Sequence, residues 1–362
     1  MQRLKHHFEP SKGWINDPNG LIYFAGRYHA FFQYNPHSAL EIAKAHWGHT
    51  VSDDLIHWEE LPIALYPDNE YETIGCWSGS AIEKEGKMYL FYTSHSEKYG
   101  QTQSVAVSED GISFTKYENN PVIARYPADG SPDFRDPKVS LIDGKYYMVC
   151  GSGKDGVGKI LLYTSENLFD WTYIGVLYED NCATVFECPD FFKIGENYLL
   201  MFSRMCHEKD SAVFVCGTFD GKKLMPLRIS MPESGPSFFA PQTFEDEKGR
   251  RLLIAWMSRW STKIQECAKF SGALTIPREI TVDNGAIKTF PVTEAAVFLT
   301  EHDPCVSHKG GTLTVNKGGA DEVSLDCGEV HTIKILKDTT SIEVFVNGGQ
   351  YSATCRISDE LA

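Results

Sequence analysis

The chain carries the stretch Trp14-Ile15-Asn16-Asp17-Pro18-Asn19-Gly20, which opens a unit that recurs along the sequence. In each copy a carboxylate stands next to a proline or one residue further from it, and a glycine turn with a tyrosine-containing strand follows. The arrangement recurs around Asp136 in Phe134–Pro137 and around Glu187 in Phe186–Asp190. If the units pack around one axis, the three carboxylates meet at one end of it and form a site.

Five such units occupy residues 1–292. Each holds short aromatic and β-branched runs, separated by turns that contain glycine, aspartate or asparagine, and few segments have a helical period. We therefore predict an all-β fold, a five-bladed β-propeller whose innermost strands line a central channel. A β-sandwich of hairpins is the alternative. It does not explain why the second, third and fifth units each close near an aromatic-polar-x-aromatic step.

Residues 293–362 follow a different pattern, with short alternating strands and a turn at Asn347-Gly348-Gly349. This pattern predicts a small, shortened β-sandwich-like module. Because such a short segment offers little core of its own, we expect it to pack on the propeller or on a partner chain, which would make a homo-oligomer.

Composition excludes several classes of protein. The net charge of −15 over 362 residues argues against a nucleic-acid surface. No apolar run has the length of a membrane span, and the start lacks the apolar segment of a signal peptide. The ten cysteines are scattered singly, as in reduced cytoplasmic proteins. His46 and His49 would point to opposite faces of a strand, so we predict neither a metal site nor a cofactor.

Three carboxylates at one mouth permit the cleavage of a glycosidic bond. One carboxylate attacks the anomeric carbon, and a second must stay protonated near neutral pH to protonate the leaving oxygen. Glu187, beside Phe186 and facing two aspartates, suits the acid because an apolar setting and nearby anions raise a carboxyl pKa. In the second and fifth units the same place holds Trp77-Ser78 and Ala240-Pro241, which could supply a stacking wall and hydrogen bonds.

These motifs resemble those of glycoside hydrolase family 32 in order and separation. The family includes invertases, sucrose-6-phosphate hydrolases, levanases and inulinases. The resemblance covers about 290 residues and implies a five-bladed propeller followed by a β-sandwich. It further implies a retaining β-fructofuranosidase that acts on sucrose, sucrose 6-phosphate or short fructo-oligosaccharides through a fructosyl-enzyme intermediate. The matching segments are Trp14–Gly20, Phe32–Pro36, His46–His49, Trp77–Ser80, Arg135–Pro137, Glu187–Asp190, Phe239–Gln242 and Leu274–Glu279.

The resemblance also implies a role for each residue. Asp17 would be the nucleophile, and Glu187 would be the general acid and then the base that activates water. Asp136 would hold fructosyl hydroxyls and stabilise the transition state, with Arg135 beside it. The residues expected to bind the sugar are Asn16, Gln33, Trp47, Trp77 and Ser78.

The segment from Glu233 to Ala240 departs from the family pattern. Glu233 stands where an aspartate is usual, and Ser237 and Phe239 stand where the family often has aspartate and tyrosine. In the family this region helps to bind the leaving group, so we expect Glu233 on that side of the pocket. The candidates for holding a phosphate on the substrate are Arg259, Lys263 and Lys269.

Two other functions remain open. The same fold could transfer fructose to a second sugar, which would make a fructosyltransferase. Alternatively, the departures and the short second module could belong to a sugar-binding protein whose catalysis has lapsed. A related arabinosidase-type enzyme with inverting chemistry is a poorer match, because of the Trp-x-Asn-Asp-Pro-Asn-Gly box.

Overall fold

The computed structural model describes residues 3–205, 211–258, 260, 268–283, 285–319 and 321–357. Strands dominate throughout these residues. The described helical segments are two short 3₁₀ turns, η1 (Glu70–Glu72) and η2 (Thr293–Phe298). The prediction of an all-β chain is confirmed.

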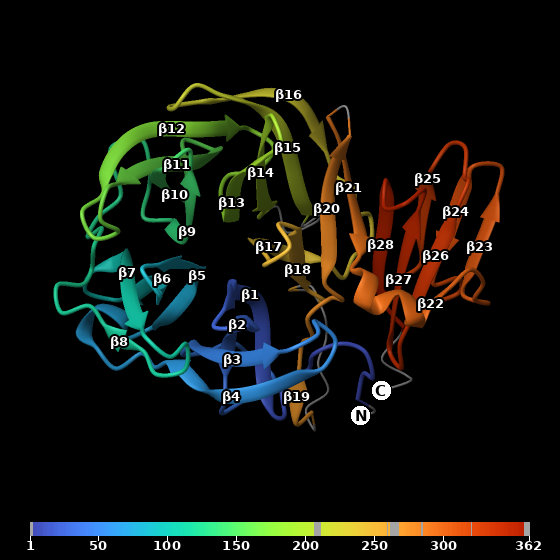
Figure 1. The fold of residues 1–362 in the computed structure, drawn as a ribbon, viewed down its shortest axis with the longest axis horizontal. Coiled ribbons are helices and arrows are strands. Elements are labelled where there is room, and N and C mark those ends of the chain that lie inside the picture. Colours follow the sequence, from blue (N-terminus) through green and yellow to red (C-terminus); the bar gives the residue numbers. More distant parts are fainter. Residues whose placement is uncertain are drawn as a thin grey trace.

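Five antiparallel sheets follow one another along the chain and surround a common centre (Figure 1). In each sheet the first strand of the unit lies innermost and the later strands lie progressively further out. The sheets are β1 (Gly13–Phe24), β2 (Arg27–Asn35), β3 (His46–Ser52) and β4 (Trp58–Leu65); β5 (Gly75–Lys84), β6 (Lys87–Ser96), β7 (Gly100–Ser108) and β8 (Thr115–Lys116); β9 (Phe134–Ile142), β10 (Lys145–Lys154), β11 (Val157–Ser165) and β12 (Thr172–Asp180); β13 (Phe186–Ile194), β14 (Asn197–Arg204), β15 (Ser211–Phe219) and β16 (Leu224–Ser230); β17 (Phe239–Glu245), β18 (Arg251–Trp256), β20 (Arg278–Asp283) and β21 (Ala286–Pro291).

Apolar side chains fill the spaces between neighbouring sheets. Phe31 and Trp47 of the first sheet pack with Leu90 of the second, and Phe186 and Phe202 of the fourth pack with Ile160 of the third. Burial of each such large side chain stabilises the fold by about 1.5–3 kcal/mol. This packing fixes the innermost strands relative to one another, and with them the side chains at their ends.

The ring is closed by a short strand from the fifth unit. β19 (Phe270–Ser271) pairs in parallel with β1, with Gly13 opposite Phe270 and Trp14 opposite Ser271. The chain that leaves the fifth sheet therefore holds the first residues of the first sheet in place.

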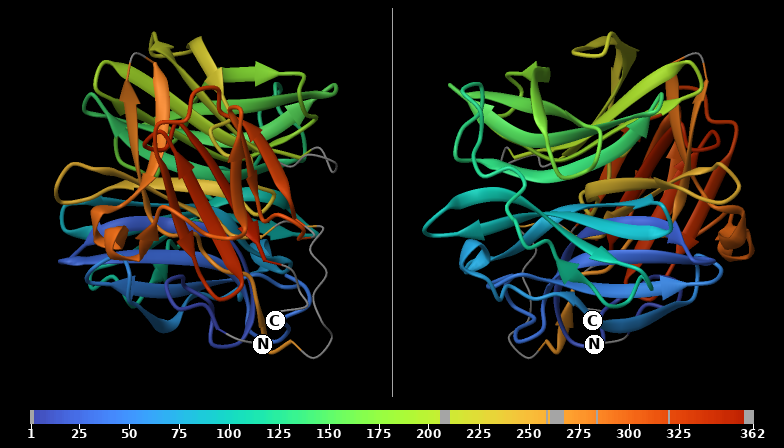
Figure 2. Two further views of the ribbon diagram at one scale, coloured as in Figure 1. Left: turned by 90° about the vertical axis from the view of Figure 1, so that its right-hand side faces the viewer. Right: turned by 60° about the vertical axis from the view of Figure 1, so that its left-hand side comes forward.

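Two further sheets follow β21. They consist of β22 (Leu299–Thr300), β26 (Ile333–Lys337), β27 (Ser341–Val346) and β28 (Tyr351–Arg356), and of β23 (Val306–Lys309), β24 (Thr312–Val315) and β25 (Val323–Asp326). Figure 2 shows them packed against the side of the ring, next to β20 and β21. The backbone nitrogen of Thr289 in β21 donates to the carbonyl of Gly349, 3.0 Å away, and Phe345 joins the core of the first and fifth sheets.

Among the described residues no helix is long and apolar enough to cross a membrane.

Candidate active site

Every innermost strand has a break in its pairing register at the same level. The breaks lie between Ile15 and Pro18, Trp77 and Gly79, Arg135 and Lys138, Glu187 and Asp190, and Phe239 and Gln242. A β-bulge leaves its extra residue unpaired and re-aims the side chains around it. The repeated bulge therefore turns five sets of side chains toward one end of the ring.

The bulges show that the three acids do not all occupy the same position relative to the proline of their strand. Asp17 and Asp136 both directly precede the proline of their strand, and Cys188 occupies this position in β13. Glu187 stands one residue earlier, in the place of Asn16 and Arg135. Asp136 and Cys188 both adopt the left-handed backbone, with φ of 60° and 47°.

A cavity of about 280 Å³ lies at this end of the ring. This volume is close to the lower bound of roughly 300 Å³ for small-molecule pockets. All three predicted acids line it. The lining residues are Asn16, Asp17, Gln33, Ile42, Ala43, Trp77, Ser78, Gln101, Asp133, Arg135, Asp136, Glu187, Met205 and Trp260.

Asp17 is buried and has one engaged and one free oxygen. Its Oδ2 accepts a hydrogen bond of 2.6 Å from the hydroxyl of Ser78, which in turn accepts one of 3.0 Å from Gln33 Nε2. Its Oδ1 is buried and has no hydrogen-bond partner among the residues that the structure describes. Burial raises the pKa of the Asp17 carboxyl, and hydrogen bonds from Ser78, Asn16 and Cys188 oppose that rise. These donors favour the anion.

Cys188 lies between the two aspartates. Its Sγ is 3.4 Å from Asp17 Oδ2 and 3.5 Å from Asp136 Oδ2, and its backbone nitrogen donates to Asp136 Oδ2 at 2.8 Å. Burial, followed by the charges of the carboxylates, raises the pKa of the Cys188 thiol well above its ordinary value. The thiol is therefore a neutral donor that packs against both acids and is not a nucleophile.

Glu187 contacts the one cation among the described residues of the cavity wall. Arg135 Nε donates to Glu187 Oε1 at 2.9 Å. Burial raises the pKa of Glu187 to about 7; Arg135 opposes the rise, and Asp136 and Asp17 add to it. Burial also raises the pKa of Asp136 to about 6. Glu187 is thus partly protonated near neutral pH, as a general acid must be.

Five of the seven residues predicted to surround the acids line the cavity: Asn16, Gln33, Trp77, Ser78 and Arg135. Trp47 does not. It is fully buried between the first and second sheets, and its indole nitrogen donates to the carbonyl of Trp77 at 2.9 Å. The assignment of Trp47 to sugar contact is therefore corrected. It supports the strand that carries Trp77 and Ser78, because its ring fills the core behind that strand.

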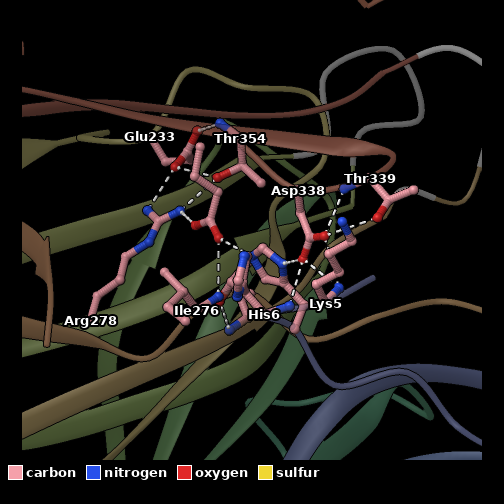
Figure 3. Close-up of polar contacts among 12 residues, drawn as sticks. Lys5, His6, Glu233, Ile276, Arg278, Asp338, Thr339 and Thr354 are labelled. Carbon is pink, nitrogen blue, oxygen red and sulfur yellow. Dashed lines mark hydrogen bonds and ion pairs between the residues drawn. The ribbon is translucent and has the colours of Figure 1, made fainter. Parts of the chain in front are cut away.

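Glu233 also lies away from the cavity, and its assignment to the leaving group is corrected. It is buried against β28, where its Oε2 is 2.8 Å from Arg278 Nη1 and its Oε1 accepts from the backbone nitrogen of Thr354 at 2.6 Å (Figure 3). Arg278 pairs on its other side with Glu343, whose Oε1 is 2.7 Å from His7 Nε2. Glu233 therefore joins the ring to the C-terminal sheets.

The neighbouring departures have the same structural explanation. The backbone nitrogen of Ser234 donates to the carbonyl of Ser352, and that of Ser237 donates to the carbonyl of Thr354. The segment thus runs along the edge of β28. Phe239 is buried in an apolar cluster with Trp14, Cys188 and Trp256.

Several cavity residues were missed by the sequence prediction: Ile42, Ala43, Gln101, Asp133, Met205 and Trp260. Asp133 could have been found, because it lies two residues before Arg135 and strand alternation places such pairs on one face. The others come from loops and from a neighbouring sheet, which no local pattern marks. Of the proposed phosphate ligands, Arg259 and Lys263 lie outside the described residues, and Lys269 is not part of the cavity wall.

No group of three potential metal ligands occurs within the part of the chain that the structure describes. The side chains of the cavity include the buried carboxyl of Asp17, a glutamate with a pKa of about 7 and a second buried aspartate with a pKa of about 6. Paired carboxyl groups, one of which has a raised pKa and can act as the acid, are typical of glycoside hydrolases. The fold and the site thus define an enzyme of this class.

Comparison with known proteins identifies the family. Residues 7–291 match the N-terminal domain of glycosyl hydrolases family 32, and the chain belongs to this family. It is 32% identical to the sucrose-6-phosphate hydrolase of Escherichia coli, over 97% of this chain and 88% of that protein. It is 33% identical to the raffinose invertase of Escherichia coli, with the same coverage. Its structure resembles that of the Bombyx mori GH32 beta-fructofuranosidase, with a TM-score of 0.86, 28% identity and coverage of 99% and 89%.

Proposed function

We propose that the protein is a retaining β-fructofuranosidase that releases fructose from sucrose, sucrose 6-phosphate or short fructo-oligosaccharides. The observation that carries the proposal is the division of labour among the three buried carboxyls. Asp17 has a free oxygen and donors that favour its anion, whereas Glu187 has a pKa raised to about 7. Family membership and the printed activities of the relatives support the substrate class.

The proposed reaction has two steps. Asp17 Oδ1 attacks the anomeric carbon of the fructosyl group, and Glu187 gives its proton to the leaving oxygen. Glu187, now an anion, takes a proton from water, which opens the fructosyl ester on Asp17 and restores both groups. Asp136 holds fructosyl hydroxyls and stabilises the positive charge that develops on the ring. Asn16, Gln33, Ser78 and Trp77 shape the sugar subsite.

We further propose that the five sheets are the blades of a five-bladed β-propeller over residues 1–292, followed by a reduced β-sandwich-like module over 293–362. The family match, which ends at residue 291, and the last strand of the fifth sheet, which ends at Pro291, support this boundary. Pairing of two copies through the second module stays a prediction. A cytoplasmic location also stays a prediction, made from the singly scattered cysteines of the sequence.

The two alternatives differ in what they require of the site. A lapsed sugar-binding protein gains no support from the geometry, because the three carboxyls lie together and shift one another's pKa. Transfer to a second sugar would use the same ester on Asp17. Product analysis at high sucrose separates it from hydrolysis, which releases equal amounts of free glucose and fructose.

The test is hydrolysis of a fructoside panel by wild-type protein and by Asp17→Asn and Glu187→Gln. We expect fructose release from sucrose or sucrose 6-phosphate, no measurable rate for Asp17→Asn, and a loss of about 10²–10⁴-fold for Glu187→Gln. Asp143→Asn is the matched control, because Asp143 is an exposed acid that pairs with Lys193 far from the cavity. Wild-type rates in either cavity variant would overturn the proposal.

A further inference from the structure

Arg135 poses a problem for a general acid. A guanidinium that donates directly to a carboxylate stabilises the charged form, and such a neighbour lowers a carboxyl pKa by about 1–3 units. Arg135 Nε donates to Glu187 at 2.9 Å, yet Glu187 has to stay protonated to act as the acid. Burial and the charges of Asp136 and Asp17 oppose this effect, and any group that competes with Glu187 for the positive charge of Arg135 weakens it further.

The other face of the same guanidinium is occupied. Arg135 Nη1 donates to Asp133 Oδ1 at 2.7 Å and to Gln101 Oε1 at 3.1 Å, and Nη2 is 3.4 Å from the sulfur of Met205. The Arg135 side chain is 8% exposed and that of Glu187 is 15% exposed, whereas that of Asp133 is 49% exposed. One cation is therefore shared between a buried carboxyl and a half-exposed one.

Both partners of the guanidinium make further hydrogen bonds that hold them in place. The carbonyl of Asp133 accepts a hydrogen bond of 2.6 Å from Ser152, a fully buried hydroxyl of β10. Gln101 Oε1 also accepts from the backbone nitrogen of Phe134 at 2.8 Å. The two acceptors of Arg135 Nη1 are thus themselves anchored to the second and third sheets.

We propose that Asp133 is a positioning residue for the acid Glu187: with Gln101 it holds the Arg135 guanidinium so that Nε faces Glu187, and its negative charge limits how strongly Arg135 stabilises the Glu187 carboxylate. The inference rests on the proposed role of Glu187. Five described titratable groups face Glu187 and Arg135. They are Asp17 on β1, His95 on β6, Asp133 just before β9, Asp136 on β9 and Cys188 on β13. Among these, Asp133 is the one carboxylate on the solvent side of Arg135.

The sign of the effect is fixed by the charges. Removing the Asp133 charge leaves Arg135 with less competition for its positive charge and also removes one anion from the surroundings of Glu187. Both changes favour the Glu187 anion, so its titration moves to lower pH. Because Asp133 is half exposed, the shift is about half a pH unit, and added salt reduces it.

The test uses Asp133→Asn, which keeps an oxygen that can accept from Nη1 and removes the charge. Carbon-13 NMR of labelled glutamate carboxyls, with the Glu187 signal assigned by its loss in Glu187→Gln, follows the titration directly. We expect the Glu187 midpoint to fall by about half a unit in Asp133→Asn and to return in Asp133→Glu. Above the pKa of Glu187, a fall of half a unit in this pKa reduces the protonated fraction of Glu187 about threefold. We therefore expect kcat/KM of Asp133→Asn to be about threefold lower on the basic limb of the pH profile.

Asp129→Asn is the matched control. Asp129 lies in the same loop and carries the same charge, but it pairs with the hydroxyl of Tyr173 and not with Arg135. An unchanged Glu187 midpoint in Asp133→Asn, or an equal shift in Asp129→Asn, would overturn the inference. This outcome is distinct from failure of the proposed function, which would appear as wild-type activity in Glu187→Gln.

Discussion

Removal of one hydroxyl, in Ser78→Ala, tests whether Asp17 works as an anion. Ser78 Oγ donates to Asp17 Oδ2 at 2.6 Å inside a buried site, and in the variant that oxygen loses its shortest donor. A hydrogen bond to a charged group contributes about 1.5–3 kcal/mol. On the acid limb of the pH profile, loss of that amount corresponds to a decrease in kcat/KM of about 10- to 150-fold, because a larger share of Asp17 is then protonated and cannot attack.

The pH profile gives the prediction a second and independent readout. The hydroxyl stabilises the Asp17 carboxylate, so its removal raises the pKa of Asp17 further, and the acid limb of kcat/KM moves to higher pH. The assay is initial-rate hydrolysis of sucrose across the pH range in both proteins. The basic limb, which belongs to Glu187, should stay in place.

Ser80→Ala is the matched control for this experiment. Ser80 lies two residues further along β5 and is equally buried, but its hydroxyl bonds the backbone of Pro137 and Val139 and does not touch the acids. Its loss should leave both limbs unmoved. A Ser78→Ala enzyme with a wild-type acid limb and less than about a threefold loss would refute the reasoning about Asp17.

Two further predictions follow from the same set of charges. Because the pKa of Glu187 is raised to about 7 and the acid must be protonated, kcat/KM for sucrose should fall as pH rises through about 7; a rate that stays flat to well above this pH would contradict the assignment. Arg278→Met leaves Glu233 and Glu343 buried without their cation and should lower the free energy of unfolding by about 3–5 kcal/mol in urea titrations, whereas Arg228→Met on the exposed face of β16 should change it little.

The parts of the site that could be predicted from the sequence are those that one strand carries by itself. Asp17 and Asp136 directly precede a proline near the start of an innermost strand, and Glu187 stands one residue further from its proline. A local pattern therefore marks all three, and the repeat places them at one end of the ring. Ser78 and Trp77 follow from the same register in the second sheet.

The parts that could not be predicted depend on contacts between distant segments. Glu233 reads as a cavity residue from its neighbours, but its partner Thr354 lies 121 residues away in β28. Trp47 lies on β3 of the first sheet, which also carries cavity residues. Its side chain, however, points to the face of β3 that packs against the second sheet. Gln101 reaches Arg135 from a different sheet, and no spacing in the sequence relates the two.

The stereochemistry of transfer to methanol tests the central claim most directly. If Asp17 forms an ester and Glu187 then activates the acceptor, sucrose in the presence of methanol gives methyl β-fructofuranoside, because two displacements at one carbon retain its configuration. NMR of the isolated product identifies the anomer without interference from mutarotation. The retaining mechanism gives the β-anomer alone, and formation of the α-anomer would contradict it.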